Sequence, residues 1–132
     1  MGEGTGIAVD EAARFHLNRS GAARAFALRL RPNQDFAGAL EDFCRERGIA
    51  RARLHGGVGS IIGARFEDGR AVEPFATELL VRSGTVAPGP GGDLEAVLDV
   101  ALVDYAGGIA EGRLVRGDNP VLMTMEIALE AI

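Results

Sequence analysis

The sequence HGGVGS at residues 55–60 decides the fold, because it joins two apolar runs that are typical of strands. Three of its glycines lie within four residues, and glycine tolerates backbone angles and close approaches that a Cβ forbids. A phosphate-binding loop would have to open a helix whose free N–H groups face the anion. The residues that follow, SIIGARF, contain a β-branched pair and a glycine, with no lysine and no helical period. The stretch therefore favours a kinked strand, or a bend between two strands, over a phosphate loop.

A strand and a helix are predicted upstream of the glycines. Apolar and other residues alternate over 24–31, which indicates a half-buried strand that Pro32 ends. Asn33 is the predicted N-cap of the helix, with Gln34 and Asp35 in its first turn. Gly48 fits the C-cap. The apolar face of the helix consists of Phe36, Leu40, Phe43 and Cys44.

Cys44 is interpreted as a small core residue. No neighbour in the sequence would activate its thiolate, so we do not expect a nucleophile there.

Strands account for most of the remaining sequence. Turn signals rich in glycine and proline separate the predicted strands, which cover residues 50–54, 61–66, 72–75, 79–86, 94–105, 109–115 and 121–132. In 94–105 the even positions from Leu94 to Leu102 are all apolar, and in 121–132 the apolar odd positions are Val121, Met123, Met125, Ile127 and Leu129. One face of each strand is therefore expected to meet the core. The fold class is α+β: a mainly antiparallel or mixed sheet of about seven strands with one principal helix packed on it.

The second face of this sheet mixes valine and alanine with charged residues. Such a face suits burial against another subunit better than full exposure to water.

Length and composition predict one domain. Of the 132 residues, 1–22 are expected to form an N-terminal arm, with a short strand or turn near Arg14–Leu17 and an exposed His16, and 23–132 to form the domain. No apolar run approaches the roughly 20 residues of a membrane span, and the N-terminus lacks the pattern of a secretory signal. A single cysteine cannot form an internal disulfide. We therefore expect a cytoplasmic protein that does not act at a membrane.

The charge distribution bears on nucleic-acid binding. The net charge of −5 opposes binding that depends on neutralising phosphates, although residues 14–53 carry nine arginines against four acidic residues. Those arginines are spread over a predicted strand and helix, which is typical of a solvated surface rather than of one patch. We therefore do not expect direct nucleic-acid binding.

Four passages together resemble the PPC domain, a family found in plants and prokaryotes, over residues 24–132. They are the strand 24–31 with its Pro32-containing helix entry, 43–49, 57–60 and 78–86. The resemblance implies an α/β domain that assembles as a homotrimer through its sheet faces. Plant members attach this domain to an AT-hook, which this chain lacks, and bacterial relatives are often labelled DNA-binding by that association. DNA binding is therefore an alternative by family analogy only.

Some prokaryotic members of the family resemble metal-site proteins, with a His-x-His in the long strand and a histidine in the next. Aligned on that pattern, this chain has Val97, Asp99 and Arg113 at the histidine positions. Valine does not bind metals, and arginine is a permanent cation. The resemblance therefore implies that the metal site is lost and that no cofactor is held. We predict instead that Asp99 and Arg113 pair across adjacent antiparallel strands.

The sequence supports a non-enzymatic trimeric module that binds a protein partner or a small anionic ligand between subunits. The candidate ligand-binding residues are His55, Gly57, Gly59, Asp99 and Arg113, although a lone histidine beside a strand end is more often structural. The alternative is an enzyme or a degenerate metal protein. It would require the fold to bring His55, Asp99 and Asp104 together as an acid–base site.

Overall fold

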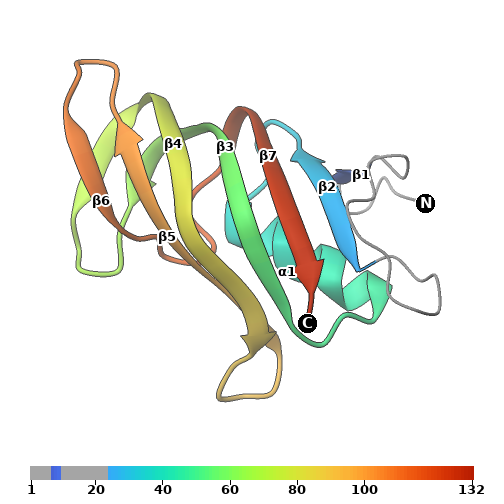
Figure 1. Ribbon diagram of the computed structural model, residues 1–132. Coiled ribbons are helices and arrows are strands. Elements are labelled where there is room, and N and C mark those ends of the chain that lie inside the picture. The colour runs from blue at the N-terminus through green and yellow to red at the C-terminus, as the bar shows by residue number, and fades with distance from the viewer. Residues whose placement is uncertain (1–6, 10–23) are drawn as a thin grey trace.

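The computed structural model describes residues 7–9 and 24–132, and one antiparallel sheet dominates it (Figure 1). The strand order is β1-β2-β7-β3-β4-β5-β6, and helix α1 crosses one face of the sheet. The elements are β1 (Ile7–Val9), β2 (Ala25–Leu30), α1 (Phe36–Arg47), β3 (Ala52–Arg65), β4 (Ala71–Pro88), β5 (Leu94–Val103), β6 (Ile109–Arg113) and β7 (Val121–Ala131). The predicted α+β class is confirmed. No helix among the described residues is long and apolar enough to cross a membrane.

The glycine stretch lies inside a single strand. β3 runs without a break through 55–60 and pairs with both β4 and β7, so the kinked strand is confirmed and the prediction of two strands meeting at the glycines is wrong. Its pairing with β7 shifts between Leu54 and Gly56 and again between Gly59 and Ile61. No helix follows the glycines, so the geometry of a phosphate loop is absent from this stretch. β-bulges bend the strand where the sequence suggested that it ended.

Two other strand boundaries also differ from the prediction. The segments 72–75 and 79–86 are parts of the one long strand β4, whose pairing with β3 is regular at 76–80 and shifts in register between Val72 and Ala76. β1 was not predicted, because its three residues carry too short a pattern; it pairs with β2 along the sheet edge. The strand or turn predicted near Arg14–Leu17, and His16, lie outside the described residues.

The helix begins two residues later than predicted. Asp35, not Asn33, is the N-cap, and its carboxylate accepts a hydrogen bond from the Gly38 N–H at 2.7 Å. The same carboxylate accepts the N–H of Asn119 at 2.9 Å, so a contact from a distant turn selects this residue as the cap. Asn33 instead adopts a left-handed conformation with φ of 71° in the preceding turn. Gly48 ends the helix at φ 69°, as predicted.

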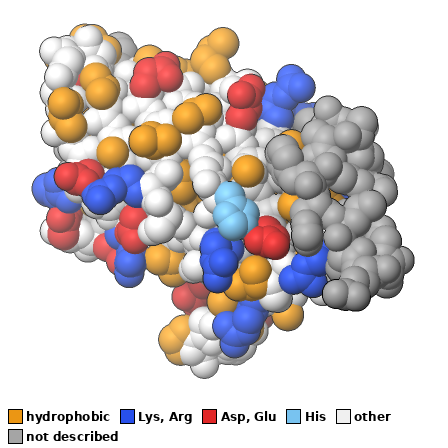
Figure 2. Space-filling view, in the orientation of Figure 1, with side chains coloured by type: hydrophobic (Ala, Val, Ile, Leu, Met, Phe, Trp, Pro, Cys, Tyr) orange, Lys and Arg blue, Asp and Glu red, His pale blue; other side chains and the backbone are white. Residues whose placement is uncertain are grey.

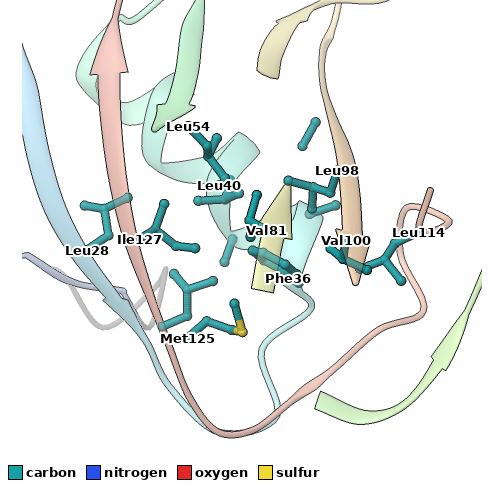
Figure 3. Close-up of a cluster of buried hydrophobic side chains, with 14 of the residues drawn as sticks. Leu28, Phe36, Leu40, Leu54, Val81, Leu98, Val100, Leu114, Met125 and Ile127 are labelled. Carbon is teal, nitrogen blue, oxygen red and sulfur yellow. The ribbon is translucent and has the colours of Figure 1, made fainter. Parts of the chain in front are cut away.

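The core fills the space between α1 and the sheet (Figure 3). Phe36 and Leu40 of the helix meet side chains from β2, β3, β4, β5 and β7, and both are fully buried. Cys44 is also fully buried, and burial raises the pKa of its thiol to about 11. The prediction that Cys44 is a core residue is confirmed.

The alternation predicted for β5 and β7 holds with one exception. The even residues Ala96, Leu98, Val100 and Leu102 are buried as expected, and Leu94 is partly buried; on β7, Val121, Met125, Ile127 and Leu129 are buried. Met123 is 67% exposed. Residues 122–124 form a bulge opposite Ser60, whose hydroxyl accepts the Met123 N–H at 3.2 Å, so the bulge turns this side chain away from the core.

A partly buried ion pair connects the helix to the segment between β6 and β7. Glu41 of α1 is 7% exposed, and its carboxylate accepts two N–H groups of Arg116, at 2.7 and 3.1 Å, and the backbone N–H of Ala96 at 2.8 Å. Burial removes water from the charged Glu41 carboxylate, which costs free energy, and these three hydrogen bonds replace the lost water. Nothing in the sequence pattern of the helix separated Glu41 from its exposed neighbours.

The chain covers the free edge of β6 with its own turn between β3 and β4. The Glu67 N–H donates to the carbonyl of Arg113 at 2.8 Å, and Phe66 forms a bridge with Leu114. The Arg70 guanidinium stacks on the Phe66 ring and donates to the Glu111 carbonyl at 2.8 Å. These contacts use backbone groups that a sheet edge would otherwise present to other chains.

Candidate functional site on the outer face of the sheet

The outer face of the sheet, opposite α1, carries a cluster of exposed apolar side chains. Val58 of β3 pairs with Leu80 of β4, and Leu80 with Ala101 of β5; Val103 and Ile109 pair one row further on. We call these five residues the apolar patch. Val58 and Leu80 are each 52% exposed and Ile109 is 80% exposed. Figure 2 shows hydrophobic side chains gathered over the upper part of this face. In one copy of the chain, the patch meets water.

Polar side chains lie beside the patch, and the predicted pair Asp99–Arg113 is among them. The two residues are directly opposite on β5 and β6, and the guanidinium donates to the carboxylate at 2.9 and 3.1 Å. The Ser83 hydroxyl adds a third bond to Asp99 at 3.2 Å. These hydrogen bonds, first that from Arg113, hold the pKa of Asp99 below its usual range, while Asp99 raises the pKa of Arg113. The cross-strand pair is confirmed.

A second ion pair, which the sequence analysis missed, lies next to the first. Arg82 of β4 bonds to Glu111 of β6. β4 pairs with β5 with a shift between Val81 and Ser83, which makes Arg82 the extra residue of a bulge. A shallow depression of about 510 Å³ is lined by Arg82, Ser83, Asp99 and Glu111, among others. Only the strand pairing could have revealed this neighbour, because Arg82 and Glu111 are far apart in the sequence.

His55 lies on the same face but in a separate contact. It is the extra residue of the β3 bulge against β7, and its Nε2 lies 2.6 Å from Oε1 of Glu130. The His55 side chain is 50% exposed. Because β4 lies between β3 and β5, His55 is two strand spacings, about 10 Å, from the strand of Asp99. The fold therefore brings Asp99 and Arg113 together and leaves His55 apart from them.

Gly57 and Gly59 have packing roles. A Cβ on Gly57 would come 2.6 Å from Cδ1 of Ile127. A Cβ on Gly59 would overlap the Thr124 carbonyl oxygen and come 2.7 Å from the Cα of Met125. Both glycines allow β7 to approach β3 closely, which accounts for their presence without a ligand.

The residues of the enzyme hypothesis do not form one site. Asp104 accepts the N–H groups of Ala106 and Gly108 in the turn after β5, and Asp99 is held by Arg113. Across residues 7–9 and 24–132, no group of three or more His, Cys, Asp and Glu side chains is placed to hold a metal ion. Val97 and Asp99 are two residues apart on β5 and therefore lie on the same, outer face of the sheet.

Several solved structures resemble this chain. A "putative DNA binding protein" from Bacteroides thetaiotaomicron has 15% sequence identity and a TM-score of 0.70, with 95% of this chain and 83% of that chain covered. A plant- and prokaryote-conserved (PPC) protein from Pyrococcus horikoshii has 22% identity and a TM-score of 0.61, with 83% and 78% covered. A metal-containing protein from Archaeoglobus fulgidus has 21% identity and a TM-score of 0.64, with 89% and 83% covered. At these identities the structures support the fold alone.

None of the curated proteins compared with the chain matches it. The model of the Plants and Prokaryotes Conserved (PCC) domain, the family also written PPC, matches residues 18–132. The match covers the described sheet from β2 to β7 and the helix that packs on it. The chain therefore belongs to the Plants and Prokaryotes Conserved domain family.

Proposed function

We propose that this chain is a non-enzymatic, homotrimeric module that binds a protein partner or a small anionic ligand at clefts between its copies. The observation that supports the assembly is the apolar patch on the outer face, in which Val58 and Leu80 are half exposed and directly opposite one another on β3 and β4. A large exposed apolar patch rimmed by polar groups is typical of a protein interface. Two arginine–carboxylate pairs rim the patch on β4, β5 and β6.

Sedimentation equilibrium tests the assembly. The unmodified chain is expected at three times its monomer mass at micromolar concentration. Leu80→Asp places a charge in the centre of the patch and is expected to give monomers that keep their far-UV circular dichroism. The control is Ile132→Asp, because Ile132 is also half exposed, at 51%, but lies outside the patch. A monomeric wild-type chain, or a Leu80→Asp variant that remains trimeric, would contradict the proposal.

The ligand part of the proposal rests on the guanidinium groups that face the outer side. Arg113 is 48% exposed and lies beside a depression that Glu67, Asp68 and Asp99 also line. An anion that competes with Asp99 would bind there. Inorganic phosphate is the probe, with calorimetry as the readout. Arg113→Gln is expected to abolish binding, and Arg45→Gln, on α1, is expected to leave it unchanged. If the wild-type protein bound no phosphate, or if the Arg113→Gln variant bound it normally, the proposal of an anion site at Arg113 would be wrong.

DNA binding is a second candidate. The structurally similar protein from Bacteroides thetaiotaomicron is named a "putative DNA binding protein", and the Arg51 and Arg53 side chains of this chain are exposed and form no ion pair with any described residue. Retardation of duplex DNA that weakens steeply with salt would support it. Absence of retardation at 50 mM salt would exclude it.

A further inference from the structure

Arg113 lies between two carboxylates and bonds to only one of them. Asp99 is opposite Arg113 on β5 and accepts its Nε and Nη2 groups at 2.9 and 3.1 Å. On the other side, the Glu67 N–H donates to the Arg113 carbonyl at 2.8 Å, which places Glu67 one strand spacing, about 5 Å, from Arg113. The Glu67 carboxylate is exposed and forms no ion pair with any described residue. It is therefore open to a group from outside the chain.

The guanidinium of Arg113 also keeps an unused edge. A guanidinium donates hydrogen bonds from all three of its nitrogens, and Asp99 occupies only the edge formed by Nε and Nη2. No described residue bonds to Nη1, and the Arg113 side chain is 48% exposed. A cationic edge and a carboxylate thus line one depression, and neither has a partner in the described part of the chain.

The depression holds more negative than positive charge. It measures about 330 Å³, and Arg113 lines it together with three carboxylates, those of Glu67, Asp68 and Asp99. Asp68 is committed to Arg70, whose Nε lies 2.8 Å from its Oδ2. Asp99, through its hydrogen bonds and its charge, raises the pKa of Arg113, and the charge of Glu67 adds to this effect. Asp99 and Glu67 would both repel a ligand that is only an anion.

A ligand with one negative and one positive group matches these charges better than a simple anion. Its carboxylate would meet the free edge of Arg113, and its ammonium group would offset the repulsion by pairing with Glu67. A lone cation would leave the guanidinium edge unused. We propose that the ligand of this depression is a small amino acid-like molecule, with its carboxylate on Arg113 and its ammonium group on Glu67, about one strand spacing apart. This inference rests on the proposed anion site and names the class of its ligand.

Three probes test the class of ligand. The first, 4-aminobutyrate, carries both charged groups on one short chain, whereas butyrate lacks the ammonium group and butylammonium lacks the carboxylate. Titration of the isotope-labelled full chain, followed by NMR, gives the dissociation constants and identifies the backbone amides that shift. We expect 4-aminobutyrate to bind about fivefold more tightly than either other probe, which is the effect of one exposed ion pair, and to shift the amides of Glu67 and Arg113.

Glu67→Gln is expected to affect two of the probes differently. It removes the partner of the ammonium group, so 4-aminobutyrate should bind about fivefold more weakly. It also removes a repulsive charge, so butyrate should bind as tightly as before or more tightly. The control is Glu46→Gln, which makes the same charge change on α1, on the opposite face of the sheet, and should alter neither probe. Circular dichroism verifies that both variants are folded.

The outcomes separate the inference from the proposed function. If Arg113→Gln abolished butyrate binding, but the wild-type chain bound 4-aminobutyrate no more tightly than butyrate, the anion site would stand and the inference would be wrong. An advantage of 4-aminobutyrate that persisted in Glu67→Gln would also overturn the inference. If the wild-type chain bound neither butyrate nor 4-aminobutyrate, the anion site and the inference would both be wrong.

Discussion

Replacing Gly59 with alanine is expected to destabilise the sheet strongly. The new Cβ would come 2.7 Å from the Cα of Met125 and overlap the Thr124 carbonyl oxygen. Ordinary carbon–carbon contacts are about 3.5–4.0 Å, so β7 would have to move by about 1 Å. β7 cannot move freely, because it pairs with β2 on one side and β3 on the other. Overpacking of this kind lowers the free energy of unfolding by about 1–3 kcal/mol. Because the obstructing atoms belong to the backbone, which cannot rotate away, we expect Gly59→Ala to lose about 3 kcal/mol.

Gly56→Ala is the matched control. Gly56 belongs to the same glycine stretch, but a Cβ there would meet no atom within 4 Å. Alanine restricts the unfolded chain, so this variant is expected to be as stable as the wild type or more stable by about 0.5 kcal/mol.

Urea unfolding followed by far-UV circular dichroism, at one protein concentration, measures both variants. A loss of about 3 kcal/mol corresponds to a fall in Tm of about 10 °C for a domain of this size. If the free energies of unfolding of Gly59→Ala and Gly56→Ala differed by less than about 0.5 kcal/mol, the close approach of β7 to β3 would not be the reason for the glycine at position 59. Unchanged stability together with lost phosphate binding would indicate that Gly59 contacts a ligand.

Three further perturbations test the polar groups and the core. Glu41→Ala removes the buried carboxylate that binds Arg116 and is expected to cost about 2–3 kcal/mol in urea unfolding; a loss below 0.5 kcal/mol would show that the pair contributes little. Arg113 lowers the pKa of Asp99, so the pair's contribution is complete above the ordinary value of about 3.9 and is lost as pH falls through the lower, folded value. Asp99→Asn should therefore be less stable than the wild type at pH 6, by under about 1 kcal/mol because the pair is exposed, and the difference should shrink as the pH falls further below about 3.9; a difference independent of pH would contradict this. Burial raises the pKa of the Cys44 thiol to about 11, so a disulfide reagent at pH 8 should label it only after denaturant is added, and immediate labelling of the folded protein would refute its burial.

Local sequence patterns predicted the elements whose contacts are regular. The alternation in β2 and β5 identified the buried faces, and Gly48 identified the end of α1. The pairing of Asp99 with Arg113 was predicted from the resemblance to the family, whose metal-site histidines align with these two positions on adjacent antiparallel strands.

The features that the sequence did not reveal depend on distant residues. Asp35 became the N-cap because the turn at Asn119 binds the same carboxylate. β3 continues through its glycines because β7 packs against them, and Arg82 reaches Glu111 because β4 bulges. A local pattern records propensity and periodicity, whereas each of these outcomes is decided by a contact between segments far apart in the chain.

The turn that covers β6 restricts how this protein can polymerise. Arg70 and Glu67 occupy carbonyl groups of β6, so an incoming chain cannot extend the sheet there without first displacing them. Growth into fibrils by successive strand addition at β6 is thereby discouraged. Substituting Arg70 would expose this edge of the sheet, and copies of the chain would gain an open-ended route of aggregation.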